Sequence, residues 1–100
     1  MEVIVEKQQQ GTTAYLKGRL DTLAAQEVEG PMEGLAEAAS GTVILDCTEM
    51  SYISSSGLRL FLMLRKAAAE KGGKIVLRGI SNDIRSVFMM TGFLNLFEIE

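Results

Sequence analysis

The residues best placed to carry chemistry are three consecutive serines, Ser54, Ser55 and Ser56, followed directly by Gly57. They stand between an apolar run of strand length, TVILDC, and a longer apolar run of helical character, GLRLFLMLRKAAAEK. Serine is favoured at the amino end of a helix, where its hydroxyl accepts a backbone N–H. The same place tolerates a phosphate, because unpaired N–H groups and the helix dipole favour negative charge. The serines therefore predict either a helix cap or a site that receives a phosphoryl group.

The chain itself lacks the groups that would activate such a serine. It has no histidine and one cysteine, Cys47, so it has no Ser-His-Asp triad and no HExxH zinc site. Neither GxxxxGK[ST] nor GxGxxG occurs. We predict that the protein is not an enzyme, has no catalytic residue or metal site, and needs no cofactor. A phosphoryl group on a serine would have to come from an external kinase.

Composition and charge limit the partners. The chain has 100 residues, of which 47% are hydrophobic and 23% charged, and its net charge is -3. Nucleic acid and anionic membranes both require a basic surface, so neither is expected as a partner. The longest uninterrupted apolar run, from Leu60 to Leu64, is too short for a bilayer span. With no signal peptide and a single cysteine, we expect one cytoplasmic domain over 1–100 without direct membrane insertion.

The periodicity of apolar residues predicts the elements that must position the serines. Strands are predicted at 2–7, 12–18, 41–47, 74–79 and 96–100, with the first two joined as a hairpin through QQQG. Helices are predicted over 21–39, 57–71 and 81–92. The order is β-β-α-β-α-β-α-β. We therefore predict an α/β fold in which a mixed sheet of about five strands carries about three helices, mainly on one face.

The first predicted helix contains an interruption. Its apolar residues recur at spacings of four, three and four residues, at Val28, Met32, Leu35 and Ala39. Pro31 removes a backbone donor and clashes with the preceding turn, which allows either a kink or two abutting short helices. Because the apolar phase continues across the proline, we expect the kink.

Several polar positions have two readings. Asp46 could bind a metal or accept hydrogen bonds from loop N–H groups. Asp21 could cap the first helix or contact a partner. Arg59 could face a partner, pair with a phosphate on Ser55, or be solvated. The cluster of Glu27, Glu29 and Glu33 is interpreted as a solvated helix face.

Four short motifs recur in an informative order: GRLD at 18–21, LD at 45–46, YISSSGL at 52–58 and MTGF at 90–93. Each motif is weak alone, but their order and spacing across the chain are specific. Together they resemble the STAS domain over nearly the whole chain, most closely the stand-alone bacterial anti-sigma-factor antagonists. One position departs from the resemblance: Ser54 stands where the best-studied members carry Asp, which adds a hydroxyl beside Ser55.

The resemblance implies a phosphorylation switch in transcription regulation. In that family, an anti-sigma factor that is also a serine kinase phosphorylates the serine two residues before the loop glycine. The unphosphorylated antagonist binds the anti-sigma factor and frees the sigma factor, while a metal-dependent serine phosphatase reverses the modification. In this chain the implied acceptor is Ser55, with Ser54 and Ser56 as alternatives. The predicted partner surface comprises Asp21, Ser54, Ser55, Ser56, Gly57 and Arg59.

Two other functions are compatible with these residues. The domain could be a constitutive STAS subunit of a lipid-transport or stress-signalling assembly, with no phosphorylation switch. It could instead bind a nucleotide or transfer phosphate through the N–H groups of the serine loop. The loop has no lysine and the chain has no histidine, which argues against this last function.

Overall fold

A long hairpin forms one edge of the sheet. In the computed structural model, which describes residues 1–9 and 11–100, β1 (Glu2–Gln8) pairs antiparallel with β2 (Gly11–Leu20). The predicted hairpin is confirmed, whereas part of the predicted QQQG turn, Gln10, lies outside the described residues. Hydrophobic residues of β2 such as Ala14 and Leu16 are buried toward the helices.

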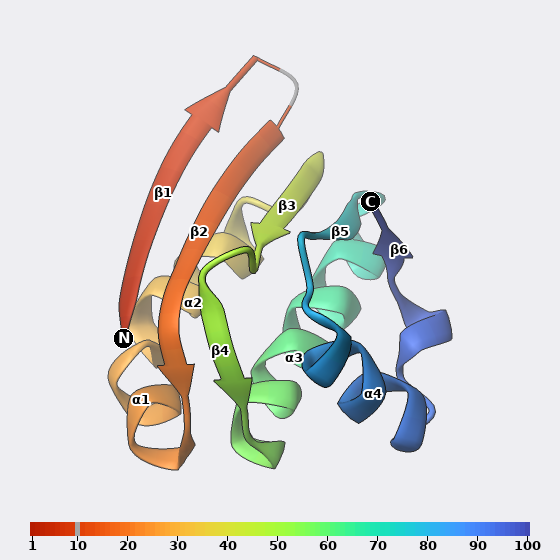
Figure 1. Ribbon diagram of the computed structural model, residues 1–100. Coiled ribbons are helices and arrows are strands. Elements are labelled where there is room, and N and C mark those ends of the chain that lie inside the picture. Colours follow the sequence, from red (N-terminus) through yellow and green to blue (C-terminus); the bar gives the residue numbers. More distant parts are fainter. Residues whose placement is uncertain (10) are drawn as a thin grey trace.

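The remaining strands extend the sheet in parallel from β2. β3 (Thr42–Asp46) pairs with β2, β5 (Lys74–Arg78) pairs with β3, and the short β6 (Glu98–Ile99) pairs with β5. The order is β1-β2-β3-β5-β6, as Figure 1 shows. The mixed α/β sheet predicted from the sequence is confirmed. The last strand is shorter than predicted because a 3-10 turn, η1 (Leu94–Leu96), precedes it.

The sequence does not predict β4 (Met50–Ile53), which pairs in parallel with the carboxyl-terminal part of β2. The described part of the chain therefore contains six strands rather than five. β2 pairs with β3 through its residues 11–15 and with β4 through its residues 18–20. The β2–β4 register shifts between Gly18 and Arg19, where Gly18 takes a φ of 107°. Such a positive φ favours glycine. A four-residue strand with an irregular register to a distant partner leaves little local signal.

Two helices replace the predicted kinked helix: α1 (Thr22–Glu27) and α2 (Glu29–Glu37), with Val28 between them. The preference for a kink is therefore wrong. Pro31 is the third residue of α2, where its missing N–H would have had no intrahelical acceptor. The Met32 N–H still donates to the Val28 carbonyl at 3.0 Å, and both side chains are buried. The apolar face thus continues across the break, as the spacing predicts.

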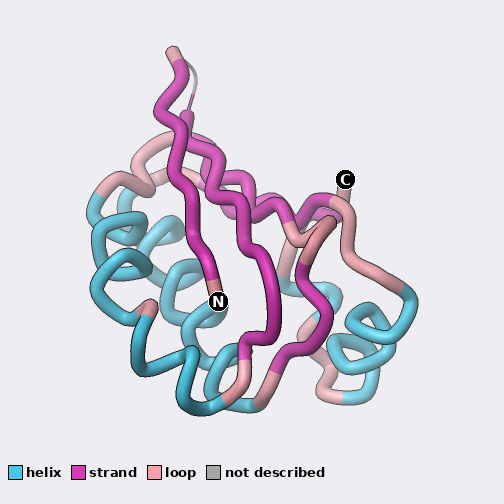
Figure 2. The backbone as a smooth tube through the Cα atoms, turned by 60° about the vertical axis from the view of Figure 1, so that its left-hand side comes forward, coloured by secondary structure: helices cyan, strands magenta, loops and turns pink. Residues whose placement is uncertain are grey.

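The other helices are α3 (Ser55–Lys71) and α4 (Asn82–Met90). α3 begins two residues before its predicted start and ends at Gly72, which takes a φ of 77°. The first three helices lie on one face of the sheet, and α4 lies beside β4 near the carboxyl ends of the strands (Figures 1 and 2). Within the described residues, no helix is both long and apolar enough to cross a membrane.

Three phenylalanines join α3, α4 and the segment before β6. The ring centroids of Phe61, Phe88 and Phe97 lie 5.8 to 6.4 Å apart, within the range of favourable aromatic contacts. All three side chains are buried. This cluster fixes residues 82–100 against the helix that carries the serine loop.

Replacement of Phe88 by alanine should lower the free energy of unfolding by about 3–5 kcal/mol, because the ring leaves a cavity among two other rings. That is a large part of the total of roughly 5–15 kcal/mol expected for a domain of this size. Urea unfolding followed by circular dichroism measures it. Met90→Ala, on the same helix but 86% exposed, should change the value by less than about 0.5 kcal/mol. Equal effects of the two substitutions would contradict the assigned core.

Candidate functional site

The serine loop lies where two parallel strands end side by side. Leu20, the last residue of β2, is the register partner of Ile53, the last residue of β4. The Ser54 N–H donates to the Leu20 carbonyl at 2.8 Å. The next residues, Asp21 and Ser54, are each the N-cap of a helix, so the first turns of α1 and α3 begin next to one another.

Both caps are made by side chains. Asp21 Oδ1 accepts the Ala24 N–H at 2.9 Å, and Ser54 Oγ accepts the Gly57 N–H at 3.2 Å. Such bonds satisfy amide groups that have no partner within the helix. The capping role predicted for Asp21 is confirmed, and its contact with a partner stays a prediction. The cap predicted for the serine run is also confirmed, and it is Ser54 that provides it.

The three serines have different environments. Ser54 is 9% exposed and its hydroxyl is occupied by the cap. Ser55 is exposed as the first residue of α3, and its hydroxyl makes no hydrogen bond to another described residue. Ser56 is half-buried and faces a cleft between the helices. Among the three hydroxyls, that of Ser55 is therefore the one most accessible to another protein.

Gly57 allows α3 to approach the ends of both strands. A Cβ atom at this position would lie 2.7 Å from Leu20 Cγ and 2.9 Å from Ile53 Cγ1. Leu20 and Ile53 are both buried, so they have little room to move. The glycine is thus required by packing and is itself buried.

Asp46 and Cys47 serve the fold beside the site. Asp46 Oδ1 accepts the Thr48 N–H at 3.0 Å, and Oδ2 lies 3.7 Å from Arg78 Nη1. The expectation that Asp46 accepts a hydrogen bond from a loop N–H group is confirmed. Burial, and next the neighbouring charge of Asp46, raise the pKa of the Cys47 thiol to about 12. Cys47 therefore remains a protonated, unreactive core residue at neutral pH.

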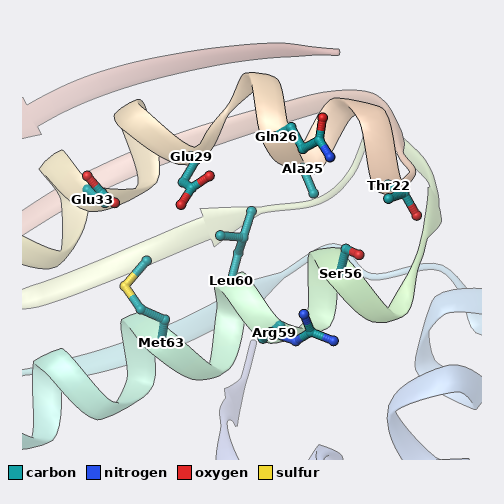
Figure 3. A pocket seen from close by; sticks show the side chains of 9 residues that line it. All are labelled: Thr22, Ala25, Gln26, Glu29, Glu33, Ser56, Arg59, Leu60 and Met63. Carbon is teal, nitrogen blue, oxygen red and sulfur yellow. The ribbon is translucent and has the colours of Figure 1, made fainter.

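A cleft of about 420 Å³ runs from the serine loop between α1–α2 and α3 (Figure 3). One wall consists of Thr22, Ala25, Gln26, Glu29 and Glu33. The other consists of Ser56, Arg59, Leu60 and Met63. Sequence reasoning did not bring these two sets together, because each is a helical stripe and nothing local shows which stripes face each other. Glu29 and Glu33, two members of the cluster interpreted as a solvated helix face, line the cleft. The third member, Glu27, does not line it.

The chain belongs to the STAS domain family, whose family model matches residues 2–100. An anti-sigma-B factor antagonist of Listeria monocytogenes is 30% identical over 87 residues, which cover 86% of this chain and 75% of that protein. The fold is also that of SpoIIAA, an anti-sigma factor antagonist whose unphosphorylated form superposes with a TM-score of 0.76 at 20% identity. That match covers 99% of this chain and 87% of SpoIIAA.

SpoIIAA of Bacillus has a phosphorylated form as well. Its structure matches 99% of this chain and 91% of its own chain with a TM-score of 0.75 and 22% identity. The family and the fold predicted from the sequence motifs are therefore confirmed.

Replacement of Ser54 by alanine should lower the free energy of unfolding by about 1 kcal/mol, because the Gly57 N–H loses its acceptor. Ser55→Ala should change it by less than about 0.5 kcal/mol, since the Ser55 hydroxyl supports no described contact. Ser54→Asp should be nearly neutral, because aspartate caps as well as serine. Urea denaturation midpoints of the three variants check this assignment. A larger loss for Ser55→Ala than for Ser54→Ala would reverse the two roles.

Two helical glycines should respond to alanine in opposite directions. Gly57→Ala should destabilise the fold by about 1–3 kcal/mol through overpacking against Leu20 and Ile53. At Gly34 a Cβ atom meets nothing within 4 Å, so Gly34→Ala should stabilise by about 0.5–1 kcal/mol through helix propensity. Thermal unfolding of the pair measures both effects. Stabilisation by Gly57→Ala would show that the close approach of α3 is not required.

Proposed function

We propose that this protein is an anti-sigma-factor antagonist whose binding to the anti-sigma factor is switched off by phosphorylation of Ser55. The observation that carries the proposal is the exposed, unengaged hydroxyl of Ser55 at the start of α3, in a chain of the STAS family. The Listeria relative named an anti-sigma-B factor antagonist supports the class of function. SpoIIAA, with the same fold, exists in phosphorylated and unphosphorylated forms.

The start of α3 suits a phosphate physically. The N–H groups of Ser55 and Ser56 belong to the first helical turn, which has no intrahelical acceptors for them. A phosphoserine adds about -1.5 to -2 charges at pH 7, and the helix dipole offsets this by about 0.3–1 kcal/mol. The fold therefore tolerates the modification, because the Ser54 cap and the Gly57 packing do not involve the Ser55 hydroxyl.

The larger effect falls on the interface. A phosphate dianion pressed against a partner surface shaped for a neutral hydroxyl costs several kcal/mol through repulsion and desolvation. A loss of about 3 kcal/mol corresponds to a roughly hundredfold weaker affinity. Since this exceeds the internal effect of the dipole, the switch acts on binding rather than on folding. Asp21, the N-cap of α1, and the exposed Arg59 of α3 complete the proposed contact surface, whereas the buried Gly57 contributes packing beneath it.

The partners supply the chemistry of the switch. The anti-sigma factor, acting as a serine kinase, brings Mg-ATP and a base that takes the hydroxyl proton. The γ-phosphoryl group moves to Ser55 Oγ and ADP leaves. A serine phosphatase then directs water to the phosphorus atom, which releases phosphate and restores the hydroxyl. Because sigma factors act on transcription inside the cell, the proposed function places this protein in the cytoplasm.

The experiment combines purified protein with each serine-kinase anti-sigma factor of the same organism and Mg-ATP. Intact-mass spectrometry with peptide mapping should find one phosphoryl group, located on Ser55. Ser55→Ala should abolish the modification, and Ser54→Ala should retain it. Ser55→Asp should weaken binding to the matching factor about a hundredfold in calorimetry.

Three results would change the proposal. A phosphate on Ser54 or Ser56 would keep the switch and move the acceptor. A Ser55→Asp variant that binds as tightly as wild type would favour a constitutive STAS subunit. Absence of phosphate under every condition, both with purified kinases and in protein isolated from its own cells, would refute the switch.

A further inference from the structure

The cleft beside the serine loop is formed by two helical stripes that face each other. On α3 its lining residues have the spacing i, i+3, i+4 and i+7 from Ser56 to Met63. On α1 and α2 they follow the same spacing from Thr22 to Glu29, and Glu33 adds a further turn across the break at Val28. A groove between two helices is the geometry in which proteins bind an amphipathic helix.

The floor of the cleft is apolar. In Figure 3 Leu60 and Met63 project from α3 into the space between the walls, and Ala25 faces them from α1. Leu60 and Met63 are only half-buried, so part of their apolar surface is available to a ligand. At about 1.5 Å per residue, the stripe on α3 is about 10 Å long and that on α1–α2 about 16 Å. The cleft therefore accommodates about two to three turns of a partner helix.

The charges of the cleft define the occupant. Glu29 and Glu33 form the rim on the α2 side, and neither makes an ion pair with a residue in the described ranges. Arg59 lies at the opposite wall, next to Ser56 and the serine loop. A ligand helix would thus need an apolar stripe, basic residues toward α2, and a neutral or acidic group beside Arg59. A phosphate at the mouth of the cleft would add negative charge near Arg59. The site beside Arg59 would then favour a basic ligand group instead of a neutral or acidic one.

At the end of the cleft far from the serine loop, hydrogen bonds hold the two walls at a fixed separation. Lys71, in the last turn of α3, donates from Nζ to the carbonyl oxygens of Ala36 and Glu37 at 3.0 and 2.9 Å. Those carbonyls belong to the carboxyl end of α2, where a cation is favourable. At the other end the two helices start from adjoining strand ends. The cleft is therefore preformed.

We infer that this cleft docks an amphipathic helix of the anti-sigma factor, with an apolar stripe flanked by lysine or arginine side chains that pair with Glu29 and Glu33. The inference rests on the proposed function and adds a second contact region to the surface around Ser55. The interface then has two parts. The cleft binds the partner through shape and charge, and phosphorylation of the serine loop weakens that binding.

The test compares two double variants that each remove two negative charges from the α1–α2 segment. Glu29→Gln with Glu33→Gln acts on the cleft, whereas Glu27→Gln with Glu37→Gln acts on exposed residues outside it. Binding to the anti-sigma factor that phosphorylates Ser55 should weaken about tenfold for the cleft pair and less than about twofold for the control pair. The difference should shrink at 1 M salt, where the screening length falls to about 3 Å.

Kinase kinetics give an independent readout. The cleft pair should raise the KM for this protein as a substrate about tenfold and leave kcat unchanged, because docking lies outside the reacting atoms. Equal effects of the two double variants, or a fall in kcat without a change in KM, would overturn the docking role. Thermal unfolding of both variants verifies that each remains folded.

A third measurement does not depend on the kinase. A synthetic amphipathic helix of leucine and lysine, titrated into ¹⁵N-labelled wild type, should shift amide signals along α1, α2 and the first half of α3. A matched peptide of leucine and glutamate should not. Shifts confined to the sheet, or sedimentation showing that a second copy of this chain fills the cleft, would overturn the inference. A further outcome distinguishes the two proposals. If no kinase modifies Ser55 but the basic peptide shifts the amide signals of the cleft helices, the proposed function is refuted and the cleft is still supported as a site for a basic amphipathic helix.

Discussion

The candidate site depends on one close contact, in which the first turn of α3 packs against the ends of β2 and β4 through Gly57. The absence of a Cβ atom lets the helix backbone approach Leu20 and Ile53 closely. The Ser54 N–H bond to the Leu20 carbonyl fixes the same junction from the backbone side. Because Asp21 and Ser54 follow these two strand ends directly, the contact makes neighbours of two helix caps that are distant in sequence. The proposed partner surface depends on the meeting of these segments.

The sheet and the helices have different electrostatic roles. The ion pairs found among residues 1–9 and 11–100 involve strands or residues adjoining strands, such as Arg78 with Asp46 and Lys74 with Glu98. Exposed pairs of this kind contribute little to stability, but they neutralise charge across neighbouring strands. Glu29 and Glu33, beside the cleft, have no such partners in that part of the chain. The carboxylates of Glu29 and Glu33 are thus available to pair with the charges of a ligand.

Adjacent serines have a structural role in one case and a proposed regulatory role in the other. Ser54 supports the helix through its cap, and the exposed Ser55 hydroxyl contributes no described contact to the fold. This division is compatible with the exchange of the aspartate that the best-studied family members carry for Ser54. Aspartate and serine are both good N-caps, so the exchange preserves the local structure and removes one negative charge next to Ser55.

The sequence by itself determined the α/β class, the hairpin, most of the buried helix faces and the placement of three serines before an apolar helix. Those features follow from local periodicity and from the preference of small polar residues for helix starts. The resemblance to the STAS family also implied Ser55 as the acceptor, which is a proposal.

Only the tertiary structure decided which serine caps α3 and which is exposed, because this depends on how the helix starts against β2 and β4. It also revealed β4, a four-residue strand that pairs with the distant β2 through an irregular register. The cleft likewise could not be predicted, since local periodicity shows that a helix has faces but not which face of another helix lies opposite. Contacts between distant segments are set by packing of the whole core, so the local sequence pattern does not predict them.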